Sequence, residues 1–169
     1  MKLVRFDAIT EEAYTSYIRE WEAEGTTIIP GASDPKGRSF AEMVKKWNYD
    51  ETDETIMNGF VPSTLYFLVD DTAGIVGAIH HRHVLNDILK QHGGHIGYGV
   101  RPSKRNLGYG SLMLGLLLKR LTGTAATEFM LTCDETNAAS QKTIEKHGGI
   151  LEAKIEFEGK MTRRYWIRT

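Results

Sequence analysis

The stretch from Gly94 to Leu118 constrains the fold most, because it reads as a strand, a glycine-rich turn and a helix in direct succession. The segment His95–Val100 is short and apolar-rich, and Pro102 ends it because proline cannot donate to a sheet ladder. The turn Arg105–Gly110 spells R-x-x-G-x-G. Two glycines two residues apart let the backbone adopt positive φ and approach a ligand closely.

The segment 112–121 that follows the turn is apolar on almost every side, which predicts a buried helix. The first N–H groups of a helix have no partner within it, and the helix dipole places partial positive charge there. Lys104 and Arg105 add positive charge beside the turn. We therefore expect a phosphate or pyrophosphate to bind at this turn.

The other elements follow from hydrophobic periodicity and from turn residues. We expect strands at 2–6, 64–69, 75–83, 95–100, 129–133, 150–157 and 161–167, a turn at 70–74, helices from Thr10 through Trp21, from Phe40 through Trp47, at 112–121 and at 137–147, and single helical turns near 56–57 and 85–89. This order predicts an α/β (α+β) fold with a mixed sheet. A length of 169 residues suits one domain over residues 1–169.

Composition and charge limit the classes of function. A net charge of −1 gives no sign of a general nucleic-acid binder. Cys133 is the single cysteine, so no internal disulfide forms and a reducing compartment is expected. The N-terminus lacks the apolar run of a signal peptide, and the longest apolar run, 112–118, is too short to span a bilayer. We expect a cytoplasmic protein without a membrane or nucleic-acid partner.

The turn can be compared with three known glycine-rich motifs. The triphosphatase loop G-x-x-x-x-G-K-[ST] has no match in the chain. The dinucleotide motif G-x-G-x-x-G fits at Gly108 and Gly110, but Met113 stands at its third glycine. The third motif is R-x-x-G-x-G after a strand that ends V-x-P, and on that motif alone an ordinary turn is an equal alternative.

A second motif lies about 30 residues downstream, in D-E-T-N-A-A-S-Q-K-T-I-E-K-H-G-G-I. The pair V-R-P-x-x-R-x-x-G-x-G and N-x-x-S…E-K-x-G-G resembles the GNAT superfamily of acyl-CoA-dependent N-acetyltransferases. The likeness runs from about Leu65 to the C-terminus, and R-H-V-L-N…G-G-H-I-G-Y-G-V-R-P is similar to a bacterial branch of predicted acetyltransferases. The resemblance implies a mostly antiparallel, twisted sheet of about seven strands with splayed central strands and about four flanking helices.

The resemblance also implies a binding site for acetyl-CoA, the acyl donor of that family. Backbone near Gly99, Val100 and Arg101 would pair with the pantetheine arm, as an added strand does. The pyrophosphate would bind main-chain N–H groups of Arg105, Asn106, Leu107, Gly108, Tyr109 and Gly110, with Ser111 close by. Asn137 and Ser140 would face the arm, although a plain helix cap is the alternative for Asn137.

The implied reaction moves an acetyl group to a primary amine of a small molecule or a protein by direct attack on the thioester. A base must keep the amine neutral, and His95 at the start of the central strand is the candidate, with a purely structural role as its alternative. Other candidate bases are His80, His81, His83, Glu20, Glu22 and Glu24. Relatives carry a proton-donating tyrosine where this chain has Ile144, which leaves the general acid open.

The remaining polar candidates are Arg82, His83 and Asn86, which match the pattern of the bacterial branch and are expected to shape the acceptor site. No cysteine and histidine spacing of a structural metal site appears, so we expect no metal, and Cys133 is expected in the core. A homodimer is common in the family. The rival hypotheses are a coenzyme A-binding module without efficient transfer and, less favoured, a nucleotide-dependent enzyme.

Overall fold

The computed structural model describes residues 1–72 and 74–169, so Ala73 in the predicted 70–74 turn lies outside the described residues. The strands are β1 (Lys2–Arg5), β2 (Ser63–Val69), β3 (Ile75–Arg82), β4 (Ile96–Val100), β5 (Glu128–Asp134), β6 (Ile150–Phe157) and β7 (Lys160–Arg168). The α-helices are α1 (Glu11–Glu24), α2 (Phe40–Asp50), α3 (Asp87–Gln91), α4 (Tyr109–Leu121) and α5 (Ala138–Lys146). Single 3₁₀ segments occupy Phe6–Ala8, Gly31–Ser33, Asp53–Asn58 and Pro102–Lys104.

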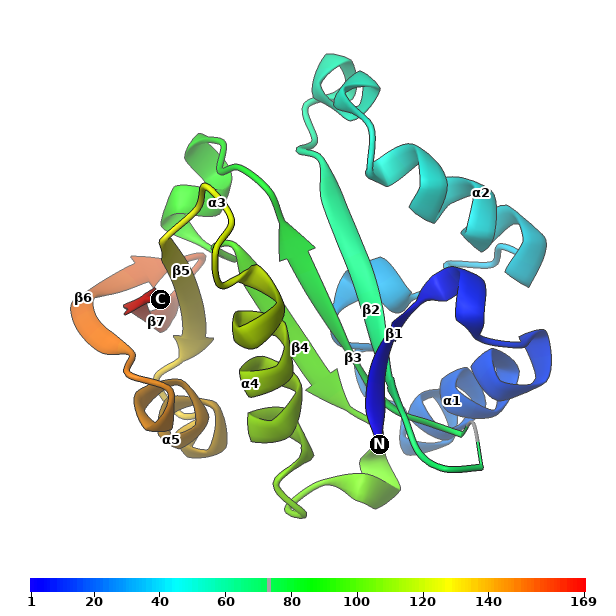
Figure 1. The fold of residues 1–169 in the computed structure, drawn as a ribbon. Coiled ribbons are helices and arrows are strands. Elements are labelled where there is room, and N and C mark those ends of the chain that lie inside the picture. Colours follow the sequence, from blue (N-terminus) through cyan, green and yellow to red (C-terminus); the bar gives the residue numbers. More distant parts are fainter. Residues whose placement is uncertain (73) are drawn as a thin grey trace.

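The strands form two sheets rather than one continuous sheet (Figure 1). One has the order β1-β2-β3-β4 and the other β5-β7-β6, and every neighbouring pair within them is antiparallel. The residues just before β4 meet β5 at an isolated bridge between Gly94 and Leu131, where the His95 N–H donates to Met130 O at 2.7 Å. The prediction of a mostly antiparallel fold with splayed central strands is therefore confirmed.

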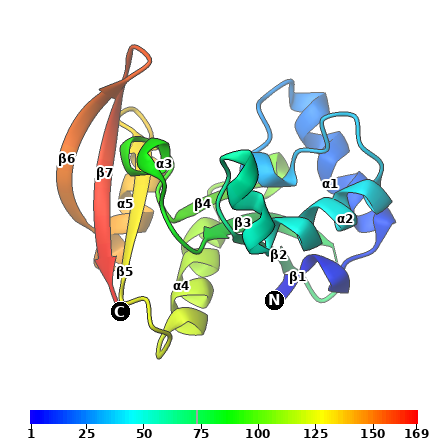
Figure 2. The same ribbon diagram turned by 90° about the horizontal axis from the view of Figure 1, so that it is seen from above.

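Two hydrophobic clusters hold the layers together. On one face α4 packs its buried Met113, Leu114 and Leu117 against both sheets and α5. On the other face of the first sheet, α1 and α2 pack against β2 and β3. Figure 2 shows the second sheet on one side of the molecule and α1 and α2 on the other, with α4 between them. The helices thus cover opposite faces of the four-stranded sheet.

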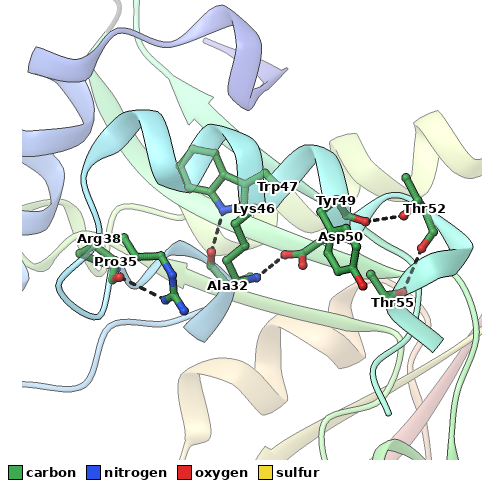
Figure 3. A network of polar contacts seen from close by, with 9 residues as sticks. All are labelled: Ala32, Pro35, Arg38, Lys46, Trp47, Tyr49, Asp50, Thr52 and Thr55. Atoms are coloured by element: carbon green, nitrogen blue, oxygen red, sulfur yellow. Dashed lines mark hydrogen bonds and ion pairs between the residues drawn. The ribbon is translucent and has the colours of Figure 1, made fainter. Parts of the chain in front are cut away.

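The helix starts follow local sequence chemistry. The Thr10 side chain accepts from Ala13 N–H at 3.3 Å, as expected for its cap. Ser39 and Glu42 form a capping box at the start of α2. Trp47 of α2 then donates from Nε1 to Ala32 O at 2.8 Å, which ties the loop between α1 and α2 to the second helix (Figure 3). This anchored loop forms one wall of the candidate site.

Two helix predictions need correction. Helix α4 begins at Tyr109 rather than at residue 112, because Gly108 with φ +80° stands directly before it as the N-cap. The last two residues of the glycine turn, Tyr109 and Gly110, therefore belong to the first turn of the helix. The helix is also not buried all round, since Leu112 is 39% exposed and Arg120 faces solvent. The expected turn near 85–89 is the short helix α3, which adds a fifth α-helix among the described residues.

Candidate active site

A cavity of about 510 Å³ lies beside β4, between the start of α4, the start of α5 and the loop after α1. Ten of the twelve predicted cofactor residues line it, namely Gly99, Val100, Arg105, Asn106, Gly108, Tyr109, Gly110, Ser111, Asn137 and Ser140. The two that do not are Arg101 and Leu107. The cavity thus joins two motifs that lie about 30 residues apart in the sequence.

The glycine turn presents a run of unpaired amides to this cavity. Within the described chain, no protein group accepts a hydrogen bond from the N–H groups of residues 106–111, and the first bond of the helix is Leu112 N–H to Gly108 O at 3.0 Å. The side chains of Lys104 and Arg105 stand beside them. Consecutive free amides at a helix start with nearby cations fit a phosphate-bearing ligand.

Strand β4 presents a second set of free amides to the cavity. Arg101 N–H donates to Val76 O at 3.0 Å and Arg82 N–H to His95 O at 2.8 Å. Because hydrogen-bonded pairs alternate along an antiparallel ladder, the amide of Gly99 also faces β3. The amides of Tyr98 and Val100 therefore face the gap between β4 and β5. They are placed to pair with an extended ligand.

This alternation corrects two predictions made from the strand. Gly99 lines the cavity, but its N–H is directed at β3. The Arg101 N–H is likewise bonded to β3, and the Arg101 side chain forms an ion pair with Glu20 at 2.6 Å, away from the cavity. Leu107, the other residue outside the lining, is 61% exposed, and its N–H has no acceptor among the described residues.

The loop after α1 closes one side of the cavity. A Cβ built on Gly99 would lie 2.1 Å from Ile29 O, so only glycine lets this loop rest on the strand. Arg105 lies 4.9 Å from the ring centre of Trp21 and forms an ion pair with Glu24 at 2.7 Å. Glu20 and Glu24 are therefore bound to arginines, which leaves neither carboxylate free to act as the base.

Hydroxyl groups line the wall opposite the loop. Tyr98 Oη lies 3.0 Å from Ser140 Oγ, and burial raises the pKa of Tyr98 to about 12. Asn137 Oδ1 accepts from Ser140 N–H at 3.0 Å, so Asn137 caps α5 as well as lining the cavity. Ile144 is fully buried in the core and offers no proton. Tyr98 therefore places a proton-bearing group in the cavity.

His95 is held between the two sheets. Its Nδ1 accepts from Met130 N–H at 2.9 Å, and its ring packs edge-on against Phe129 and Trp166. With Nδ1 occupied as an acceptor, the neutral ring carries its proton on Nε2 and has no free lone pair. Burial, and then the charge of Arg82, lower the pKa of His95. The structure thus speaks against His95 as the base and gives it a structural role.

The other predicted histidines and acceptor residues lie at the end of β3. His83 Nε2 is 3.0 Å from Thr64 Oγ1, and burial lowers the pKa of His81 to about 4. Asn86 caps α3 through Leu89 N–H at 2.9 Å and donates to Gly59 O at 3.2 Å. Arg82 donates from Nη1 to Gly93 O and Gly94 O, at 3.3 and 2.9 Å. Asn86 therefore has a structural role that the sequence pattern did not reveal.

Sequence reasoning missed seven residues of the cavity wall: Trp21, Thr26, Thr27, Ile29, Tyr98, Ala139 and Thr143. Tyr98 could have been found from the sequence, because it lies two residues before Val100 on the same strand and therefore shares its face. Trp21 and Ile29 had no such signal, since only the packing of α1 and its loop against β4 brings them to the cavity. Cys133 is 8% exposed within the core, as expected.

The family model for the GNAT acetyltransferases matches residues 10–149. The chain therefore belongs to the GNAT family of acetyltransferases, and it is an enzyme of the acyltransferase class. No curated protein sequence matches it.

Solved structures of similar fold are N-acetyltransferases as well. The dodecameric spermidine N-acetyltransferase from Vibrio cholerae is 13% identical, with TM-score 0.67 over 99% of this chain and 92% of that chain. RimL, the ribosomal L7/L12 α-N-protein acetyltransferase in complex with coenzyme A, is 17% identical, with TM-score 0.66 over 98% and 92%. At these identities the likeness concerns the fold.

Two other kinds of feature are absent from the described residues. No three or more histidine, cysteine, aspartate or glutamate side chains gather there in a group that could hold a metal ion. In the same part of the chain, every helix falls short of the length and apolarity that a membrane crossing requires.

Proposed function

We propose that this protein transfers an acetyl group from acetyl-CoA to a primary amine, within one domain formed by residues 1–169. The observation that carries the proposal is the run of six unpaired amides at residues 106–111, five of which belong to residues that line the same cavity as the free edge of β4. The amides of residues 106–111, called the cradle below, suit a diphosphate. The free edge of β4 suits an extended arm that contains amides. Coenzyme A has both parts, whereas a nucleoside triphosphate lacks the arm.

The thioester supplies the activated acetyl group, and the chain's residues bind and orient it. The Tyr98 and Val100 amides face the gap, where one of them is placed to stabilise negative charge on the thioester oxygen. Tyr98 Oη, with Ser140 Oγ beside it at 3.0 Å, holds a proton for the departing sulfur. The amine proton would leave through water, since Glu20 and Glu24 are paired with arginines and Nδ1 of His95 is occupied. Much of the rate then comes from holding amine and thioester together.

The acceptor is a small-molecule or a protein amine. The two solved structures named above are a spermidine N-acetyltransferase and a ribosomal L7/L12 protein acetyltransferase, and these names support keeping both classes of acceptor in the proposal. Homodimer formation and a cytoplasmic location stay predictions.

Binding and turnover test the proposal separately. Calorimetry with coenzyme A, ATP and NAD should show binding of coenzyme A alone, and release of free thiol from acetyl-CoA across a panel of amines should show transfer. Coenzyme A binding without turnover on any amine would favour a binding module instead. Absence of coenzyme A binding would refute both functions.

A further inference from the structure

Arg82 differs from every other arginine in the described part of the chain. Six arginines pair with a carboxylate, namely Arg5, Arg101, Arg105, Arg163, Arg164 and Arg168. The remaining four are Arg19, Arg38, Arg82 and Arg120, and all of them except Arg82 are exposed. Arg82 thus combines partial burial with the lack of a counter-charge. Partly buried charges are normally paired, because a desolvated charge is costly.

Only one of the three guanidinium nitrogens of Arg82 donates hydrogen bonds to the described residues. Both of its hydrogen bonds leave from Nη1, to Gly93 O and Gly94 O. Nε and Nη2 have no partner among the described residues, yet neither is sealed from solvent. The neighbouring rings are neutral, since burial and then the charge of Arg82 lower the pKa of both His80 and His95. One edge of a planar cation is therefore available to a ligand.

The position of Arg82 connects this edge with the proposed reaction. The cradle lies beyond the C-terminal end of β4, and the strands close at the other end, at the Gly94 bridge. An extended arm that starts at the cradle and follows β4 must run toward Gly97, and residues 100 to 96 span about 13 Å. A Cβ built on Gly97 would lie 3.9 Å from Arg82 Nη1. The guanidinium therefore lies over the part of β4 where the acyl end of the arm arrives.

We infer that Arg82 binds an oxyanion carried by the acceptor, so that the substrate is a small amine that also bears a carboxylate or a phosphate. This inference rests on the proposed function. A guanidinium binds either group through two parallel hydrogen bonds. It also disfavours polycationic acceptors, because a second positive charge would meet the unpaired arginine.

Matched acceptor pairs test the inference. Each pair consists of an amino acid and the amine left after loss of its α-carboxyl group, with phosphoethanolamine and ethanolamine as the phosphate pair. The wild-type protein should prefer the anionic member of at least one pair by about tenfold to a hundredfold in kcat/KM. Arg82→Gln keeps an N–H donor for the Gly94 carbonyl but loses the charge, so this preference should vanish.

Arg120→Gln is the matched control, since Arg120 donates to a backbone carbonyl, Leu3 O, at 3.4 Å, and Leu3 lies on β1, at the opposite edge of the sheet from β4. It should keep the wild-type preference. The inference is overturned if the wild-type protein prefers the member without the carboxylate or phosphate in every pair it uses, or if Arg82→Gln slows both members equally.

A binding measurement covers the case in which no pair is turned over. Acetylated amino acids and acetylated phosphoethanolamine should raise the Tm of the coenzyme A-loaded wild-type protein but not that of Arg82→Gln. No rise with any of these anions overturns the inference. Loss of coenzyme A binding by the wild-type protein would instead refute the proposed function, so the two failures are distinguishable.

Discussion

The hydroxyls of Tyr98 and Ser140 lie 3.0 Å apart across the wall of the cavity, one on β4 and the other in the first turn of α5. Neither residue occupies the position at which relatives carry their proton-donating tyrosine, because Ile144 stands there in the core. The burial that raises the pKa of Tyr98 to about 12 keeps this hydroxyl protonated, and therefore a donor.

Replacement of Tyr98 by Phe should lower kcat by about a hundredfold, the usual size of a lost proton donor. The loss should shrink with an acyl donor whose thiol has a lower pKa, because such a sulfur leaves without a proton. Tyr66→Phe is the control, since Tyr66 packs against the core from β2. A loss that is equal for both acyl donors would argue that Tyr98 only shapes the cavity.

Replacement of Gly108 by Ala should weaken coenzyme A binding by at least about tenfold, because the added methyl group enters the cradle. The substitution also strains the backbone, because Gly108 has φ +80°. It causes no clash within the protein, because no atom lies within 4 Å of a built Cβ. Gly123 has φ +83° and equal free space, outside the cavity. Gly123→Ala should thus lose similar stability, about 1–2 kcal/mol, and keep its affinity. Equal affinity losses in calorimetry would contradict the cradle.

The role of His95 can be tested with two substitutions. His95→Asn retains an acceptor for Met130 N–H and should stay close to wild type in stability and activity. His95→Leu leaves that N–H without a partner and should lower the free energy of unfolding by about 1–3 kcal/mol. Denaturant titration measures the difference. A stable Asn variant without activity would restore His95 as the base.

Stability should depend on pH through the buried histidines, His81 among them. Burial lowers the pKa of His81 in the folded state to about 4, whereas the unfolded value is near 6.5. Between these values the unfolded chain binds more protons, so stability is full above about pH 6.5 and falls as the pH drops toward 4. The shift corresponds to about 3 kcal/mol at most.

His81→Leu should reduce the dependence of the free energy of unfolding on pH between 4 and 7. A remainder should persist, because burial also lowers the pKa of His80, His83 and His95. Leu117→Val is the comparison, because it weakens the core at a fully buried site without a titrating group. An unchanged slope in His81→Leu would assign the pH dependence to other groups.

Local chemistry made the elements around the site predictable. Thr10 and Asn137 cap helices through their own side chains, and Gly108 adopts the positive φ that the turn before α4 requires. These are interactions between residues a few positions apart, so the sequence displays them directly. The resemblance added the relation between the glycine turn and the N-x-x-S motif.

The sequence by itself determined the glycine turn and the helix start that follows it, because these depend on residues a few positions apart. That the amides of residues 106–111 stay unpaired depends also on packing, since no group of another described element reaches them. Tertiary packing decided the rest. It bound Nδ1 of His95 to the backbone of β5, and it left Arg82 without a counter-charge. Such properties depend on which groups arrive from other elements, and no spacing along the chain records that.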